Sequence, residues 1–434
     1  MHLSLISRGF VRATSLVAVV TIPMALHAQT VAITGGKVYP VSGPPIENGT
    51  VVIIDGRITA VGANIVIPAG ARRVDATGKW VTPGLVDAMS VIGVNEIGLS
   101  AGYIDAGAKG EKGIAAGFRV WEGFNPATAF LPPARKDGIT TVGVLPNKGI
   151  VQGQAAAMDL LDGTVAEMIL KAPVAMIGDV SNGSGEAGAR GELIARWREL
   201  LRDVKAYQLR KTQYESNQSR QFAASRADLD ALVPVVTGTT PLWLIADRAS
   251  DIEAALTLAR EFSLRIAILG GTEAWMIADK LAAAKVPVMV GSMNDIPTSF
   301  NTLGARQENP ALLRAKGVHV VLIGNGAGDA SAYNAGNLRY DAGNAVAYGM
   351  TWDDALRAAT LSPAEALGVA DKVGSLGVGK MGNVVIWSGD PFEFATMPEH
   401  VFIHGTEFTR PTRDEDLTQR YKTQPPTYRK RPAG

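Results

Sequence analysis

The chain has 434 residues, of which 47% are hydrophobic and 19% are charged. It is long enough for a large domain plus a smaller one and too apolar to remain disordered. The 42 Lys and Arg residues nearly balance the 41 Asp and Glu residues, which excludes a global charge that would recruit nucleic acid or an anionic membrane. The absence of Cys excludes disulfide scaffolds, thiolate metal sites and cysteine nucleophiles.

The beginning of the chain has the pattern of a secretory signal peptide. Arg8 and Arg12 precede an apolar run over 16–26, and Ala28 supplies a small residue at the cleavage point. The alternative is a membrane anchor, but the run is shorter than the roughly 20 residues that a membrane span needs. We therefore expect residues 1–28 to be removed and the mature protein to be periplasmic or otherwise exported.

Both ends of the remaining chain are rich in β-forming residues. Within 30–81, two strand patterns flank Asp55–Gly56, a dipeptide typical of a tight hairpin. Near the other end, NVVIWSGDP and EHVFIHGTEF have the same character. We predict one composite β-sandwich domain made of residues 30–81 and 375–410, followed by a flexible tail over 411–434.

The middle of the chain, 82–374, alternates apolar strand patterns with helical ones. Helical patterns follow most strands, as at Asp251–Phe262, Thr272–Ala284 and Pro310–Lys316. An eighth strand is expected between Val91 and Val120, where glycine is dense. Apolar strands separated by helices predict an α/β fold, a (β/α)8 TIM-type barrel, with an open doubly wound sheet as the alternative. The other candidate strands are 80–88, 139–146, 172–179, 241–247, 265–270, 286–291 and 318–324.

A long charged stretch at 188–231 interrupts this alternation. Charges of both signs recur around its helical pattern. We interpret it as a helical insertion whose surface is solvated.

Four stretches of the chain carry a resemblance to a known family. They are VIPAGARRVDATGKWVTPGLVDAMSVIG at 66–93 and the segments 124–156, 246–281 and 337–391. In order and spacing they resemble the metal-dependent amidohydrolase superfamily, in particular the exported members related to imidazolonepropionase. The resemblance implies a barrel and a hydrolase that acts on non-peptide C–N bonds with a divalent metal.

The frame of the family's first barrel strand is present, but its metal ligands are not. That strand ends in Pro-Gly-x-x-Asp-x-His-x-His in the family, and the two His bind the metal. Pro83, Gly84 and Asp87 preserve the frame here, whereas Met89 and Val91 occupy the two His positions.

The later ligand positions differ from the family in the same way. A further His is normally found where this chain has Ile245 to Asp247, and another near Gly270. The family's last strand normally ends in an Asp that serves as ligand and general base, where this chain has Asn325 with Asp329 nearby.

The chain has too few histidines to rebuild the family's site. It has five, of which His2 and His27 would leave with the signal peptide. The other three, His319, His400 and His404, are scattered, and we interpret them as structural because His binds metal when clustered. We therefore expect no metal and no cofactor.

Two functions remain open. The first is a non-catalytic homologue that binds a small molecule at the barrel mouth, or pairs with a second copy or an active relative. The alternative is an active hydrolase with a rearranged, carboxylate-based site, for which Asp247, Glu273 and Asp329 would have to converge. Further carboxylates near this face are Glu96 and Asp295. No catalytic residue is assigned, and the predicted ligand-pocket residues are Asp87, Met89, Val91, Asp179, Asp247, Gly270, Glu273, Asn325 and Asp329.

Overall fold

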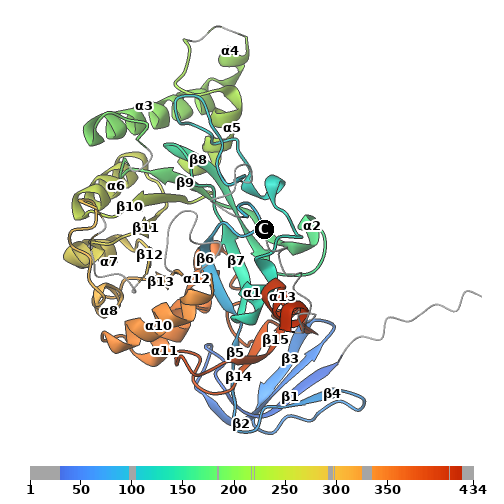
Figure 1. Ribbon diagram of the computed structural model, residues 1–434. Helices are drawn as coiled ribbons and strands as arrows, with labels where there is room; N and C mark the ends of the chain where they lie inside the picture. Colours follow the sequence, from blue (N-terminus) through green and yellow to red (C-terminus); the bar gives the residue numbers. More distant parts are fainter. Residues whose placement is uncertain are drawn as a thin grey trace, which may run out of the picture.

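The computed structural model of the chain describes residues 30–96, 104–182, 185–216, 218, 220–291, 297, 299–324, 335–409 and 411–422. The expected signal peptide lies outside these residues. Two 8-stranded sheets organise the described chain, and Figure 1 shows them as a strand-rich lower part and a larger upper part wrapped by helices. No helix among the described residues has the length and apolarity needed to cross a bilayer.

The first sheet, sheet A, is assembled from both ends of the described chain. Its strands follow the order β16-β15-β14-β5-β1-β2-β3, with β4 paired to β1. The pairing of β14 with β5 is antiparallel and joins the two chain ends directly. The strands are β1 (Val31–Val38), β2 (Ile46–Ile54), β3 (Arg57–Gly62), β4 (Arg72–Asp75), β5 (Trp80–Pro83), β14 (Val384–Trp387), β15 (Pro398–Ile403) and β16 (Thr406–Glu407).

The hairpin predicted at Asp55–Gly56 is confirmed. It joins β2 to β3, with Ile54 paired to Arg57 across the turn. Asp55 has φ 51° and Gly56 has φ 75°. Positive φ at both central positions is the geometry that matches the twist of two paired strands, and Asp-Gly tolerates it well.

The second sheet, sheet B, is nearly a closed barrel. Its strands run in the order β13-β12-β11-β10-β9-β8-β7-β6, and the two end strands, β13 and β6, also contact each other. The predicted fold class, a barrel with a separate β unit made from the chain ends, is confirmed. The strands are β6 (Leu85–Ser90), β7 (Ile139–Val144), β8 (Val151–Asp159), β9 (Ile169–Asp179), β10 (Leu242–Ala246), β11 (Ile266–Gly270), β12 (Val288–Val290) and β13 (Val320–Leu322).

The prediction for the eighth barrel strand was wrong in place and direction. The eighth strand is β8, not a strand between Val91 and Val120, and it pairs antiparallel with both β7 and β9. Its sequence, VQGQAAAMD, is poor in β-branched residues, so it carries little strand signal. Ala155 and Ala157 are buried in the barrel interior, where tertiary packing rather than propensity selects them.

The stretch 80–88, predicted as one strand, is two strands in different sheets. β5 belongs to sheet A and β6 to sheet B, and Gly84 lies between them. A Cβ at Gly84 would lie 2.1 Å from Thr140 Oγ1. The chain therefore passes from one sheet to the other at a point where only glycine fits.

Helices cover the outside of sheet B, and one of them, α12, closes its interior. Alternate residues of β10–β13, such as Trp243 and Met289, share an interior cluster with Ala364 and Leu367 of α12. The helices of the described chain are η1 (Val120–Gly123), α1 (Leu131–Lys136), α2 (Val165–Met168), α3 (Arg190–Leu209), α4 (Lys211–Glu215), α5 (Arg226–Val236), α6 (Ala249–Phe262), η2 (Ala274–Ile277), α7 (Ala278–Ala284), α8 (Asn309–Ala315), η3 (Ala335–Asn337), α10 (Leu338–Ala347), α11 (Trp352–Ala358), α12 (Leu361–Leu367) and α13 (Arg413–Lys422).

Two segments differ from their sequence interpretation. The insertion at 188–231 contains α3, which is not simply solvated, because one face of it is buried and carries Trp197 and Tyr207. The stretch expected to be a flexible tail contains α13, whose Glu415 pairs with Lys136 of α1. The rest of that stretch, from 423, lies outside the described residues.

Candidate functional site

The predicted pocket residues at the end of β6 do not face one point. Asp87 is buried, and its Oδ1 accepts a hydrogen bond from the Met89 N–H at 3.1 Å. Met89 packs against the barrel interior, whereas Val91 belongs to the separate cluster that includes Val94 and Phe124. The two positions that carry His in the family pattern thus pack into different clusters.

The carboxyl group of Asp87 is the most perturbed acid at this end of the barrel. Its Oδ2 atom has no hydrogen-bond partner among the described residues. Burial raises the pKa of Asp87 from 3.8 to about 7, the backbone N–H groups of Met89 and Gly324 oppose the shift, and the charge of Asp341 adds to it. Asp341 lies on α10 and is itself buried.

Two further predicted acids, Asp179 and Asp247, lie at the ends of β9 and β10. Asp179 Oδ1 accepts hydrogen bonds from the N–H and the hydroxyl of Ser181, at 2.6 and 2.7 Å. Asp247 Oδ1 accepts a bond from the Thr272 hydroxyl at 2.6 Å. Burial raises the pKa of Asp247, and the charges of Asp251 and Asp179 raise it further, so these three acids lie close enough to interact.

Asp247 takes the space that a side chain at Gly270 would need. A Cβ at Gly270 would lie 2.6 Å from Asp247 Oδ1, and the φ of Gly270 is +93°. Both facts oppose any larger residue here. Near the position where the family pattern has a His, the backbone of this chain is therefore shaped for glycine.

Glu273 holds two neighbouring loops rather than converging with Asp247. Its Oε2 accepts from the Ala249 N–H at 3.0 Å, and its Oε1 accepts from the Gly304 N–H at 3.1 Å. The Glu273 N–H donates to the Asp247 carbonyl oxygen at 2.8 Å, but the carboxyl groups of these two residues have different partners. Asp247 and Glu273, two of the three carboxylates that a rearranged hydrolytic site would need, thus accept hydrogen bonds from the loops around them.

The remaining predicted positions are less informative. Asn325 and Asp329, like Asp295, lie outside the described residues. Glu96 is described, and its Oε1 accepts a bond from Asn125 Nδ2 at 3.0 Å. Within the described ranges, no group of three or more His, Asp or Glu side chains is arranged to hold a metal ion.

Sequence reasoning missed an arginine at this end of the barrel. Arg190, at the start of α3, donates Nε–H bonds to both carboxylate oxygens of Asp251 and an Nη2–H bond to Asn301 at 2.6 Å. This contact ties the insertion to α6. A pair of residues 61 positions apart leaves no local pattern that would have revealed it.

The three described histidines all have partners away from the barrel mouth. His404 Nε2 lies 2.7 Å from Asp159 Oδ2, and Asp159 also accepts a bond from Asn383 Nδ2 at 3.1 Å. This network joins β7 and β8 to sheet A at the amino end of the barrel. His400 lies 2.6 Å from Glu407, and His319 Nε2 lies 3.3 Å from the Ser362 carbonyl oxygen.

Comparison with known families agrees with this architecture. The sequence pattern described as "Amidohydrolase family" matches residues 127–408, which is more than half of the chain. The chain belongs to the amidohydrolase family. The predicted resemblance is therefore confirmed, and the barrel mouth is the end at which barrel enzymes carry their active sites.

Individual relatives of this family span several activities. The chain is 26% identical over 364 residues to the imidazolonepropionase of Bradyrhizobium diazoefficiens, covering 79% of this chain and 87% of that protein. It is 32% identical over 168 residues to the dihydroorotase of Anaeromyxobacter dehalogenans, covering 39% of this chain and 32% of that protein. The chain thus matches about a third of the length of the dihydroorotase.

A solved structure of the family has the same fold over its whole length. The amidohydrolase from Thermotoga maritima MSB8 superimposes with a TM-score of 0.79 at 29% identity. The match covers 88% of this chain and 100% of that one.

Proposed function

We propose that this amidohydrolase-family protein is exported, has a degenerate metal site, and binds a small molecule at the barrel mouth without catalysing metal-dependent hydrolysis. One observation carries the proposal. Met89 and Val91 stand where the family pattern has His, and Gly270, near a further His position, has a φ of +93° that disfavours any residue but glycine.

The residues at these positions do not fit a catalytic divalent metal. Such a metal lowers the pKa of its bound water from about 15.7 to about 7, and it needs nitrogen or oxygen ligands to stay bound. Val91 and Gly270 supply no ligand atom, and the soft thioether of Met89 is a poor ligand for zinc. Val91 also packs apart from Met89, so the two positions do not converge.

The carboxylates support the same proposal, because their contacts are those of loop anchors. Asp179, Asp247 and Glu273 each accept hydrogen bonds from nearby backbone or hydroxyl groups. Such bonds fix the shape of the loops around the mouth and leave fewer lone pairs for a metal or a water.

Metal content of the purified protein tests this proposal. After dialysis against zinc and then manganese, followed by buffer exchange, elemental mass spectrometry is expected to find far less than one metal per chain. A value close to one would overturn the proposal and favour the carboxylate-based hydrolase. The variant Asp247→Asn then locates the metal, since a site built on Asp247 would lose it.

Export and pairing need their own measurements. Export predicts that protein recovered from the periplasm or medium begins after Ala28, as intact mass would show. Pairing with an active relative predicts that such a relative co-purifies with the protein from its native source. Purification without any related chain would rule out pairing and leave the small-molecule ligand.

A further inference from the structure

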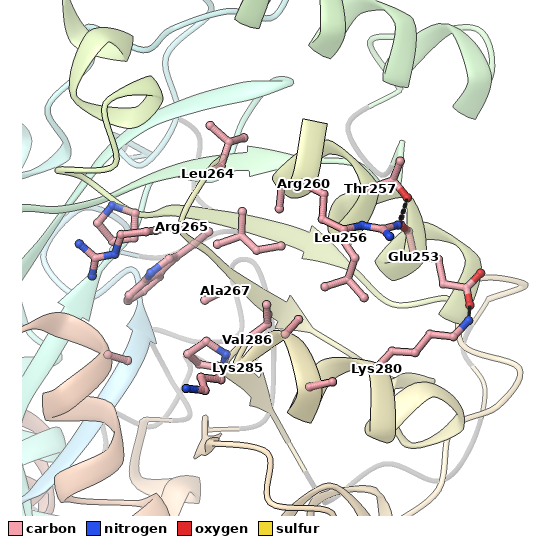
Figure 2. Close-up of a pocket in the computed structure, with 18 of the residues that line it drawn as sticks. Glu253, Leu256, Thr257, Arg260, Leu264, Arg265, Ala267, Lys280, Lys285 and Val286 are labelled. Carbon is pink, nitrogen blue, oxygen red and sulfur yellow. Dashed lines mark hydrogen bonds and ion pairs between the residues drawn. The ribbon is translucent and has the colours of Figure 1, made fainter. Parts of the chain in front are cut away.

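A cavity of about 990 Å3 opens at the end of the barrel opposite to the mouth. Its lining residues include Pro241, Arg265 and Pro287, which immediately precede or begin strands β10, β11 and β12. Figure 2 shows the cavity between α6, α7 and these strand beginnings. It is therefore separate from the site considered above, and nothing in the proposed function depends on it.

The inner walls of the cavity are apolar. Trp243 and Ala267 reach it from the barrel interior, and both are almost completely buried. Leu256 of α6 and Val286 before β12 line it from the outer side. A volume near 990 Å3 lies at the upper end of the range in which proteins bind small organic molecules.

The charged residues around this apolar space are predominantly basic. Four cations and two carboxylates line the cavity, namely Arg260, Arg265, Lys280, Lys285, Glu253 and Glu365. Both carboxylates are already paired, Glu253 with Lys280 and Glu365 with Arg357. Figure 2 shows the contact between Glu253 and Lys280 at one side of the cavity.

Three of the cations make no such direct contact with a carboxylate that the structure describes. Among the described residues, Arg260, Arg265 and Lys285 form no ion pair with a carboxylate. Arg260 Nη2 donates to the Thr257 hydroxyl at 3.2 Å, and Arg265 Nη1 donates to the Gly238 carbonyl oxygen at 3.2 Å. These contacts hold two guanidinium groups beside the cavity without neutralising them.

We propose that this cavity binds a small organic anion, a molecule with a carboxylate or sulfonate head and an apolar body. The head would pair with Arg260, Arg265 and Lys285, which form no ion pair within the described chain, and the body would replace water against Trp243, Leu256 and Val286.

Calorimetric titration of the full mature chain with decanoate tests the proposal. We expect one decanoate per chain, and weaker binding of decanol, which has the same apolar body without the charge. Arg260→Gln and Lys285→Asn are each expected to weaken decanoate binding by about 10-fold, the effect of losing one charge-assisted hydrogen bond. Asparagine suits Lys285 because this residue has φ 53°.

Two further variants separate this site from general effects. Arg413→Gln removes an exposed cation of α13 and is expected to leave decanoate binding unchanged. Ala283→Trp places a large ring on an exposed position of the cavity lining and is expected to abolish binding of decanoate and decanol alike.

Several results would overturn the proposal. They are no decanoate binding, equal affinity for decanoate and decanol, or an Arg413→Gln effect as large as that of Lys285→Asn. The oligomeric state, measured by sedimentation velocity, provides a further test. If the wild-type chain is a dimer that Ala283→Trp converts to a monomer, the cavity is an interface with a second copy and not a ligand site.

Discussion

The buried carboxyl group of Asp87 makes a quantitative prediction about stability and pH. Asp87 is 1% exposed, and its pKa is raised to about 7 by burial. In the unfolded chain the same group is solvated and has its ordinary pKa of 3.8. Replacing it by the uncharged isostere in Asp87→Asn removes this difference while keeping an oxygen that accepts from the Met89 N–H.

The sign follows from which state binds the proton more tightly. With a higher pKa in the folded protein, the contribution of Asp87 to the free energy of unfolding is complete below pH 4. It falls as the pH rises towards 7 and is constant above that. A difference of about three pKa units corresponds to about 4 kcal/mol in total, of which about 3 kcal/mol is lost between pH 5 and pH 8.

Urea denaturation at a series of pH values between 5 and 8 measures this effect. The free energy of unfolding of Asp87→Asn is expected to fall by about 3 kcal/mol less than that of the wild type over this range. Asp55→Asn, at the exposed hairpin turn, is the matched control and should follow the wild-type curve. Parallel curves for Asp87→Asn and the wild type would refute the assignment of a raised pKa to Asp87.

Two other variants test the junction between sheet A and the barrel. Gly84→Ala places a Cβ against Thr140 and is expected to lower the free energy of unfolding by about 2–4 kcal/mol in urea titration. The control is Gly191→Ala on α3, where a Cβ meets open space, and it should not lower the free energy of unfolding. His404→Ala leaves Oδ2 of the buried Asp159 without its hydrogen-bond partner, so we expect a loss of about 2–4 kcal/mol. Adding Asp159→Asn to His404→Ala should recover part of that loss. If His404→Ala were as stable as the wild type, the His404–Asp159 contact would contribute nothing to the free energy of unfolding.

The barrel could be predicted from sequence wherever burial on both faces makes a strand apolar. Strands β10 to β13 are of this kind, and their patterns coincide with the predicted ranges within a few residues. β8 could not be predicted, because its alanines are chosen for the space left inside the barrel between β7 and β9. The division of 80–88 into β5 and β6 was also hidden, since the apolar pattern continues across Gly84 while the sheet changes.

The candidate site shows the same limit. The identities of Met89, Val91 and Gly270 at family ligand positions can be read directly from the chain. The separation of Met89 from Val91 cannot, because it depends on which cluster each side chain joins in the folded chain. The partners of the carboxylates were equally inaccessible to sequence reasoning, as the Arg190–Asp251 contact illustrates.

The fold class, the family and the lack of ligand atoms at the His positions can be read from the sequence, because these depend on residue type and order along the chain. The folded chain is needed to show which carboxylates anchor loops, that Gly270 has a positive φ, and where three cations that form no ion pair in the described chain lie around one cavity. The physical reason is that hydrogen bonding, desolvation and close packing depend on distances between residues far apart in the sequence, and these distances exist only once the chain has folded.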